Sequence, residues 1–153
     1  RVPALVTPRG VLSETLALLL YVAQTYPQAN LAPLNDPFRL AHMQEINSYL
    51  ASTVHVNHAH RTRAGRWADD ETAQQAMKAK VPQNMRDAFA IIEQHYLSDA
   101  PWVLGEQYSV ADPYLFTVAG WLKSDGVDIN EFPRVAAHHA RVAARPAVQK
   151  ALA

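Results

Sequence analysis

The sequence contains no cysteine among its 153 residues. This absence excludes disulfide bonds, thiolate metal sites and a cysteine nucleophile within the chain, and it is typical of cytoplasmic proteins, so we expect that location. Positive and negative charge are also balanced, with 14 Lys and Arg against 14 Asp and Glu. A balanced chain has no electrostatic footprint for nucleic acid or an anionic membrane, and neither partner is expected. The longest apolar run, Leu16 to Ala23, is too short to span a bilayer.

What is present is typical of a soluble globular protein, because 49% of the residues are hydrophobic and 18% are charged. The length suffices for a real hydrophobic core. The chain does not open with a charged segment followed by an apolar one, so a signal peptide is not expected from these residues. The chain begins at Arg1 and is strand-like by Val2, whereas domains usually have slack before their first element. We therefore expect that a preceding part of the protein is missing from this chain.

The first part of the chain predicts a β-hairpin followed by a helix. Val2–Thr7 is apolar and β-prone, Pro8–Gly10 is a turn signal, and Val11–Ser13 reads as a second strand. From Glu14 to Tyr26 the spacing of apolar residues is typical of a helix, and Pro27 ends that helix.

After a loop at 28–35, the remainder reads as helical, so the predicted fold class is mainly α. The first long helix begins with Asp36 as N-cap and Pro37 at the first helical position. The second contains Pro82, which should kink or restart it. The expected helices cover residues 36–64, 69–96, 109–122, 133–145 and 147–152. The predicted apolar face of the first of them consists of Phe38, Ala41, Ile46, Leu50 and Val54.

Val2-Pro3 stands immediately before a strand. A cis bond here would leave the backbone N–H and C=O of Val2 facing outward, able to pair with a peptide-like ligand as an added strand does. The alternative is an edge-strand proline without a ligand. Taken alone, the dipeptide favours that alternative.

Glu14-Thr15 lies at the junction between the second strand and the helix. Free N–H groups and the positive end of the helix dipole attract a carboxylate there, Thr15 adds a hydroxyl, and Glu14 can pair with an amino group. These groups suit the α-amino acid end of a ligand. The alternative is an ordinary helix cap.

Together the two features resemble a known family. Val-Pro-Ala-Leu, a turn, and Leu-Ser-Glu-Thr leading into Leu-Ala-Leu-Leu-Leu-Tyr-Val-Ala are similar to the second half of the thioredoxin-like domain of glutathione transferases. The resemblance implies that the backbone of Val2 pairs with the cysteinyl unit of glutathione. It also implies that Glu14 and Thr15 hold the γ-glutamyl end.

A third feature lies downstream, where Ser109 and Asp112 have the spacing of a capping box. Each side chain can satisfy a free backbone N–H at a helix start, and the cap residue is typically worth about 0.5–2 kcal/mol. The segment resembles the buried capping motif in the helical domain of glutathione transferases. Neither residue is expected to be catalytic.

Within the family, the stretch Asn47 to His55 is most similar to the first long helix of the bacterial beta class. The resemblance implies that His55 faces the glutathione thiol as an auxiliary catalytic group, for which an imidazole is suited near neutral pH. It also implies that Ser48, Ser52 and Thr53 contribute to glutathione binding. Ser48 departs from the pattern, because the class often has Asn there.

Two clusters near this helix have simpler interpretations. His58 shares a helix face with His55, but a metal site needs further ligands, and we expect no metal. Arg61, Arg63 and Arg66 form a basic run. We favour a solvated helix end over a pocket for anionic electrophiles, because charge runs usually face solvent.

The resemblance implies conjugation of glutathione thiolate to a small electrophile in a homodimeric enzyme. A non-catalytic binding or scaffold protein on the same fold and a glutathione-dependent disulfide reductase remain alternatives. The family's main thiol-activating residue stands upstream of this chain, so we expect the chain alone to be inactive. The expected organisation is the end of a thioredoxin-like domain at 1–27, a linker at 28–35 and an all-helical domain at 36–153.

Overall fold

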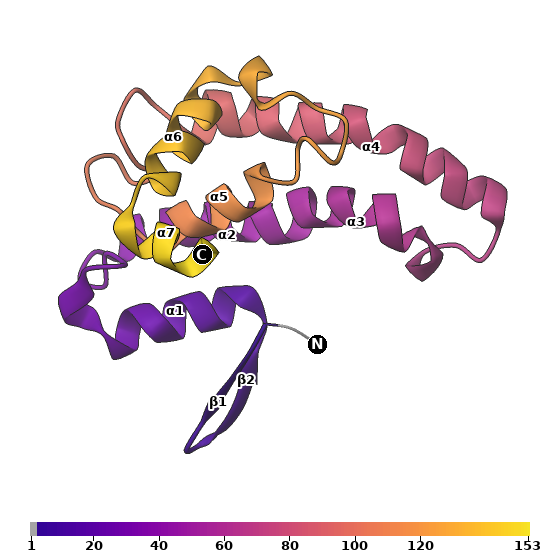
Figure 1. The fold of residues 1–153 in the computed structure, drawn as a ribbon. Coiled ribbons are helices and arrows are strands. Elements are labelled where there is room, and N and C mark those ends of the chain that lie inside the picture. Colours follow the sequence, from indigo (N-terminus) through magenta and orange to yellow (C-terminus); the bar gives the residue numbers. More distant parts are fainter. Residues whose placement is uncertain (1–2) are drawn as a thin grey trace.

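The computed structural model describes residues 3–153, and Val2 therefore lies outside the described residues. The predicted hairpin is confirmed: β1 (Ala4–Thr7) pairs antiparallel with β2 (Gly10–Ser13), with Ala4 opposite Ser13. Gly10 has φ 132°, a conformation that glycine adopts without strain, at the end of the turn. The hairpin extends away from the helices (Figure 1), and its Val6 and Val11 side chains are 80% and 67% exposed.

Helix α1 (Thr15–Thr25) follows the hairpin and ends as predicted before Pro27, where a 3-10 turn (Pro27–Ala29) begins. Leu16 and Leu19 pack against the core, and Ala23 is buried. The segment after the turn is fastened to the helices, because the Val110 N–H donates to the Leu31 carbonyl at 2.9 Å.

The first long helix is continuous but not uniform. It comprises α2 (Pro37–Tyr49), a π-helical turn (Leu50–Val54) and α3 (His55–Arg63), and a 3-10 turn (Ala64–Arg66) ends it. The predicted N-cap is confirmed, since the Asp36 carboxylate accepts the Arg39 N–H at 3.0 Å. The π turn had no signal in the sequence analysis.

The predicted apolar face of this helix was wrong at its start. Phe38 is 83% exposed and Ala41 is exposed, whereas Met43 is fully buried. The helix turns by about 100° per residue, so Phe38 points roughly 140° away from Met43. The buried stripe runs instead through Met43, Ile46, Leu50 and Val54.

Helix α4 (Glu71–Ile91) is capped by Asp70, which accepts the Ala73 N–H at 2.7 Å, and a second π turn (Ile92–Tyr96) extends it. Pro82 lies inside α4, and the helix does not restart there. A proline inside a helix costs about 3 kcal/mol. Burial of the neighbouring Val81 and Met85 in the core offsets that cost.

Helix α5 (Ala111–Ala119) is shorter than predicted at both ends, because it starts after Ser109 and stops before Leu122. Gly120 is its C-cap, and turns carry the chain on to Gly126, whose φ is 79°. Leu122 is nevertheless fully buried. The apolar spacing that predicted a longer helix therefore indicates only that these side chains are buried. A residue in a turn, such as Leu122, can be buried as fully as one in a helix.

A 3-10 turn (Ile129–Glu131), α6 (Pro133–Ala143) and α7 (Pro146–Leu152) complete the fold. Helix α5 lies between α2 and α6, and α3 packs on α4 (Figure 1). The core between them contains Phe89, Ile92, Leu115, Val118 and Leu122. The mainly helical fold class is thus confirmed. Across residues 3–153, no helix combines the length and apolarity that crossing a membrane requires.

Candidate active site

A cavity of about 360 Å³ opens where the start of α1, the start of α3 and one side of α5, with the turn after it, meet. Two of the predicted site residues, Thr15 and His55, line it from different helices. Its lining is mainly apolar. The described residues that form it are Pro3, Thr15, Leu19, His55, Pro113, Tyr114, Thr117 and Trp121.

The α1 end of this cavity has an unusual backbone. Glu14 is the N-cap of α1 with φ 71° and ψ 120°, a conformation that a non-glycine residue rarely adopts. Within residues 3–153, its side chain makes no capping hydrogen bond. The ordinary cap interpretation therefore does not apply to the Glu14 side chain, which is exposed. Such strain is characteristic of ligand sites, where the surrounding structure maintains it.

His55 begins α3 directly after the π turn, and π turns inside helices occur frequently at functional sites. Burial lowers the pKa of the His55 imidazole below its ordinary value. The positive charges of His58, Arg63 and Arg66 act in the same direction. His55 is therefore a neutral imidazole near pH 7, able to accept a proton.

Ser48 and Ser52 share a helix face with His55, but the cavity lining does not include them or Thr53 among the described residues. The Ser52 hydroxyl donates to the Ser48 carbonyl at 2.8 Å. The hydroxyl hydrogen of Ser52 is thus already engaged in a hydrogen bond within the helix. Glu14 likewise stands next to a lining residue and does not itself line the cavity in the part of the chain from 3 to 153.

The sequence analysis missed the side of the cavity formed by α5 and the turn after it. Tyr114, Thr117 and Trp121 recur at intervals of three and four residues, which is the only sequence signal that they share a face. Burial raises the pKa of the Tyr114 phenol, which therefore keeps its proton at neutral pH and is an O–H donor.

Comparison with known proteins identifies the family. The model of the glutathione S-transferase C-terminal domain matches residues 58–153. Glutathione S-transferase GstA of Escherichia coli O157:H7 is 30% identical over 99% of this chain, which spans 72% of that protein. The chain belongs to the glutathione S-transferase family.

Solved structures of glutathione transferases are similar over almost the whole chain. A Sulfitobacter glutathione transferase homolog with bound glutathione is 43% identical with a TM-score of 0.95, covering 99% of this chain and 73% of that one. The beta class glutathione S-transferase of Sphingomonas chungbukensis is 30% identical with a TM-score of 0.84, covering 99% and 72%. The predicted family is thus confirmed, and so is the predicted similarity to bacterial members of it, the beta class included.

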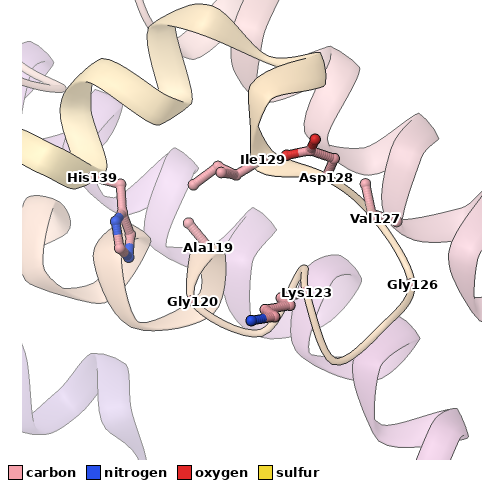
Figure 2. A pocket seen from close by; sticks show the side chains of 8 residues that line it. All are labelled: Ala119, Gly120, Lys123, Gly126, Val127, Asp128, Ile129 and His139. Atoms are coloured by element: carbon pink, nitrogen blue, oxygen red, sulfur yellow. The ribbon is translucent and has the colours of Figure 1, made fainter.

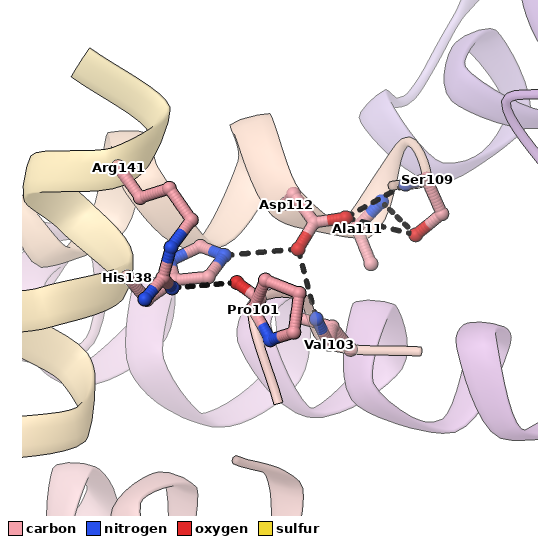
Figure 3. Close-up of polar contacts among 7 residues, drawn as sticks. All are labelled: Pro101, Val103, Ser109, Ala111, Asp112, His138 and Arg141. Atoms are coloured by element: carbon pink, nitrogen blue, oxygen red, sulfur yellow. Dashed lines mark hydrogen bonds and ion pairs between the residues drawn. The ribbon is translucent and has the colours of Figure 1, made fainter. Parts of the chain in front are cut away.

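In this glutathione transferase chain, Asp112 connects the start of α5 to two other segments (Figure 3). Its Oδ2 accepts the Ser109 N–H at 2.7 Å, as the predicted capping box requires. The Ser109 Oγ, however, accepts from the Ala111 N–H at 3.3 Å rather than from Asp112. Asp112 Oδ1 also accepts the Val103 N–H and the His138 Nε2–H, both at 2.9 Å, and neither contact was predicted. The network fixes the helix that carries one wall of the cavity.

The histidine and arginine clusters form no metal site that the structure describes. Within residues 3–153, no three His, Cys, Asp or Glu side chains lie close enough to hold a metal ion. His58 instead contacts Asp125, an acidic partner that local spacing did not indicate. The arginines Arg61, Arg63 and Arg66 are exposed, as a solvated helix end requires.

A larger cavity, of about 480 Å³, lies between the end of α5 and α6 (Figure 2). His139 stacks on Phe116 at its edge with 4.4 Å between ring centroids, and burial lowers the pKa of His139. Asp128 also lines it, but its Oδ1 already accepts from the backbone N–H and the side-chain amide of Asn130. This cavity contains none of the residues that carry the family resemblance.

Proposed function

We propose that the protein conjugates glutathione, as its thiolate, to small electrophiles, a detoxification reaction. The observation that carries this proposal is the single cavity that joins Thr15, at the start of α1, to His55, at the start of α3. The glutathione bound to the Sulfitobacter homolog, 43% identical to this chain, supports it.

At the α1 end, the γ-glutamyl group binds to Glu14 and Thr15 in this proposal. The Glu14 carboxylate is exposed and pairs with the α-amino group, while the Thr15 hydroxyl and the N–H groups at the helix start bind the α-carboxylate. Val2 pairs with the cysteinyl backbone. Ser48, Ser52 and Thr53 remain proposed contributors to glutathione binding from the helix that carries His55.

The reaction needs an ionised thiol, because the thiolate is the nucleophile. The sulfur of glutathione loses its proton, forms a bond to the electrophilic carbon, and the leaving group departs with the bonding electron pair. His55 assists by accepting the thiol proton, for which its neutral state at pH 7 is suited. It is an auxiliary group in this scheme, alongside the family's principal thiol activator.

The electrophile occupies the α5 side of the cavity. Leu19, Pro113 and the indole of Trp121 present apolar and aromatic surface there. Flat rings stack favourably on an indole face. The proposed electrophile is therefore small, planar and apolar rather than anionic.

We further propose the domain organisation and assembly that the family implies. Residues 1–27 form the end of the glutathione-binding domain, 28–35 the linker and 36–153 the helical domain. The exposed Val6, Val11 and Phe38 are apolar surface available to a second copy, in a homodimer. The location is the cytoplasm, where thiols are kept reduced. Sedimentation velocity and cell fractionation test these two points.

Retention on immobilised glutathione tests the function, using protein expressed from its complete coding sequence. Wild-type protein should be retained and eluted by free glutathione, and Thr15→Val protein less so. Absence of retention would favour the non-catalytic scaffold and refute the transferase and the disulfide reductase together. Activity on an aromatic halide, compared with reduction of a glutathione mixed disulfide, then separates those two reactions.

A further inference from the structure

Trp121 lies in the cavity wall although α5 has already ended two residues before it. The segment Gly120–Gly126 is a loop of turns between α5 and the 3-10 turn at Ile129 (Figure 2). A turn inside the loop links Trp121 to Asp125, since the Asp125 N–H donates to the Trp121 carbonyl at 3.0 Å. A wall residue on such a loop needs an external contact to hold its position.

Asp125 provides that contact. Its side chain is completely buried, and its two carboxylate oxygens lie 2.8 and 2.9 Å from Nδ1 of His58 on α3. Because the carboxylate oxygens accept, Nδ1 carries the proton. The Arg61 guanidinium adds a longer contact of 3.9 Å. The loop is thereby fastened to the same helix that carries His55.

The His58 ring also touches the Trp121 indole. The two rings are stacked, with 4.4 Å between centroids and 21° between planes. His55 meets the same indole edge-on at 5.1 Å and 62°. Trp121 therefore contacts two imidazoles, that of His55, which lines the cavity, and that of His58, which Asp125 holds.

We propose that His58 and Asp125 are positioning residues that fix Trp121 in the cavity wall and so determine the preference for planar aromatic electrophiles. The inference rests on the proposed transferase function. A buried carboxylate paired with an imidazole is weak support for stability alone, because desolvation offsets much of the attraction. A role in fixing one arrangement of a loop explains its presence at this place.

Two variants separate the parts of the contact. Asp125→Asn retains the His58 and Trp121 side chains but removes the negative charge that holds the His58 ring, whereas His58→Gln keeps a donor for Asp125 and removes the ring. His60→Gln is the matched control, because the His60 ring lies against Trp67, tilted by 55° with 4.2 Å between centroids, and comes from the same helix outside the cavity. If Asp125→Asn fails to fold, as circular dichroism would reveal, His58→Gln provides the test.

Three quantities are measured on protein from the complete coding sequence: glutathione affinity by calorimetry, and kcat/KM for an aryl halide and for iodoacetamide. The aryl halide KM should rise roughly three- to tenfold in both variants, the factor expected for a misplaced aromatic contact. Glutathione affinity, iodoacetamide turnover and the His60→Gln protein should change little. The ratio of aryl to iodoacetamide kcat/KM is the readout that a merely structural role would not move.

An unchanged ratio with intact glutathione binding would overturn the positioning role and leave the transferase function standing. Equal losses for both electrophiles would overturn it as well, because they indicate general damage. A wild-type protein that binds no glutathione would overturn the transferase function, and the selectivity role with it.

Discussion

Replacing Asp112 by Asn should destabilise the helical domain strongly. The carboxylate is fully buried and accepts hydrogen bonds from the Val103 N–H, the Ser109 N–H and the His138 Nε2–H, at 2.7 to 2.9 Å. Asn has one acceptor oxygen instead of two. At least one buried donor then faces an amide NH₂ group, with no acceptor in place of the lost oxygen.

The magnitude follows from those contacts. A hydrogen bond to a charged acceptor contributes about 1.5–3 kcal/mol, and a buried donor left unpaired costs about 1–3 kcal/mol. We therefore expect Asp112→Asn to lower the free energy of unfolding by about 2–4 kcal/mol. A domain is typically stable by only about 5–15 kcal/mol, so this is a large fraction.

Urea unfolding followed by far-UV circular dichroism measures this change. With an m-value of about 1–3 kcal/mol/M, the midpoint should fall by roughly 0.7–4 M. Asp128→Asn is the matched control, since Asp128 also caps a turn by accepting the Asn130 N–H at 2.9 Å but is exposed. A loss for Asp112→Asn no larger than the control's would refute the buried-network argument.

Three further predictions concern the cavity and pH. His55→Gln should lower kcat/KM roughly 10- to 100-fold in the protein from the complete coding sequence, with glutathione affinity almost unchanged; a purely structural His55 would lower both. Thr15→Val should weaken glutathione binding by calorimetry about 2- to 10-fold, the value of one hydrogen bond. The control variant Thr25→Val should leave glutathione binding unchanged, because the Thr25 hydroxyl lies at the other end of α1 and donates to the Tyr21 carbonyl. Folding lowers the pKa values of His55 and His139 below the ordinary histidine value of 6.5. At and below pH 6.5 the unfolded chain therefore binds more protons than the folded chain. The free energy of unfolding should therefore fall as pH drops through 6.5 in urea titrations, and less steeply in His139→Gln protein; an identical slope would contradict this.

Local signals predicted the elements well where the chain's own chemistry determines them. The Asp36 cap and the end of α1 before Pro27 both stand where the sequence places them. Each depends on residues within one turn of the boundary. The failures at Phe38 and Leu122 have the opposite cause. There the side that is buried, and the point at which α5 stops, depend on packing between helices.

The residues of the candidate site differ in the same way: some are recognisable from local sequence, and others only from packing. Thr15 and His55 were predicted because each belongs to a motif that is contiguous in sequence, and the fold then brings both to one cavity. Trp121 belongs to no such motif. Its place in the wall requires that α5 stop at Ala119 and that Asp125 reach His58, 67 residues away in the sequence. A single sequence contains no signal for a contact of that range, whereas the geometry of the folded chain assigns it directly. The residues proposed to bind glutathione are thus accessible to motif reasoning, while those proposed to select the second substrate emerge only from the packed structure.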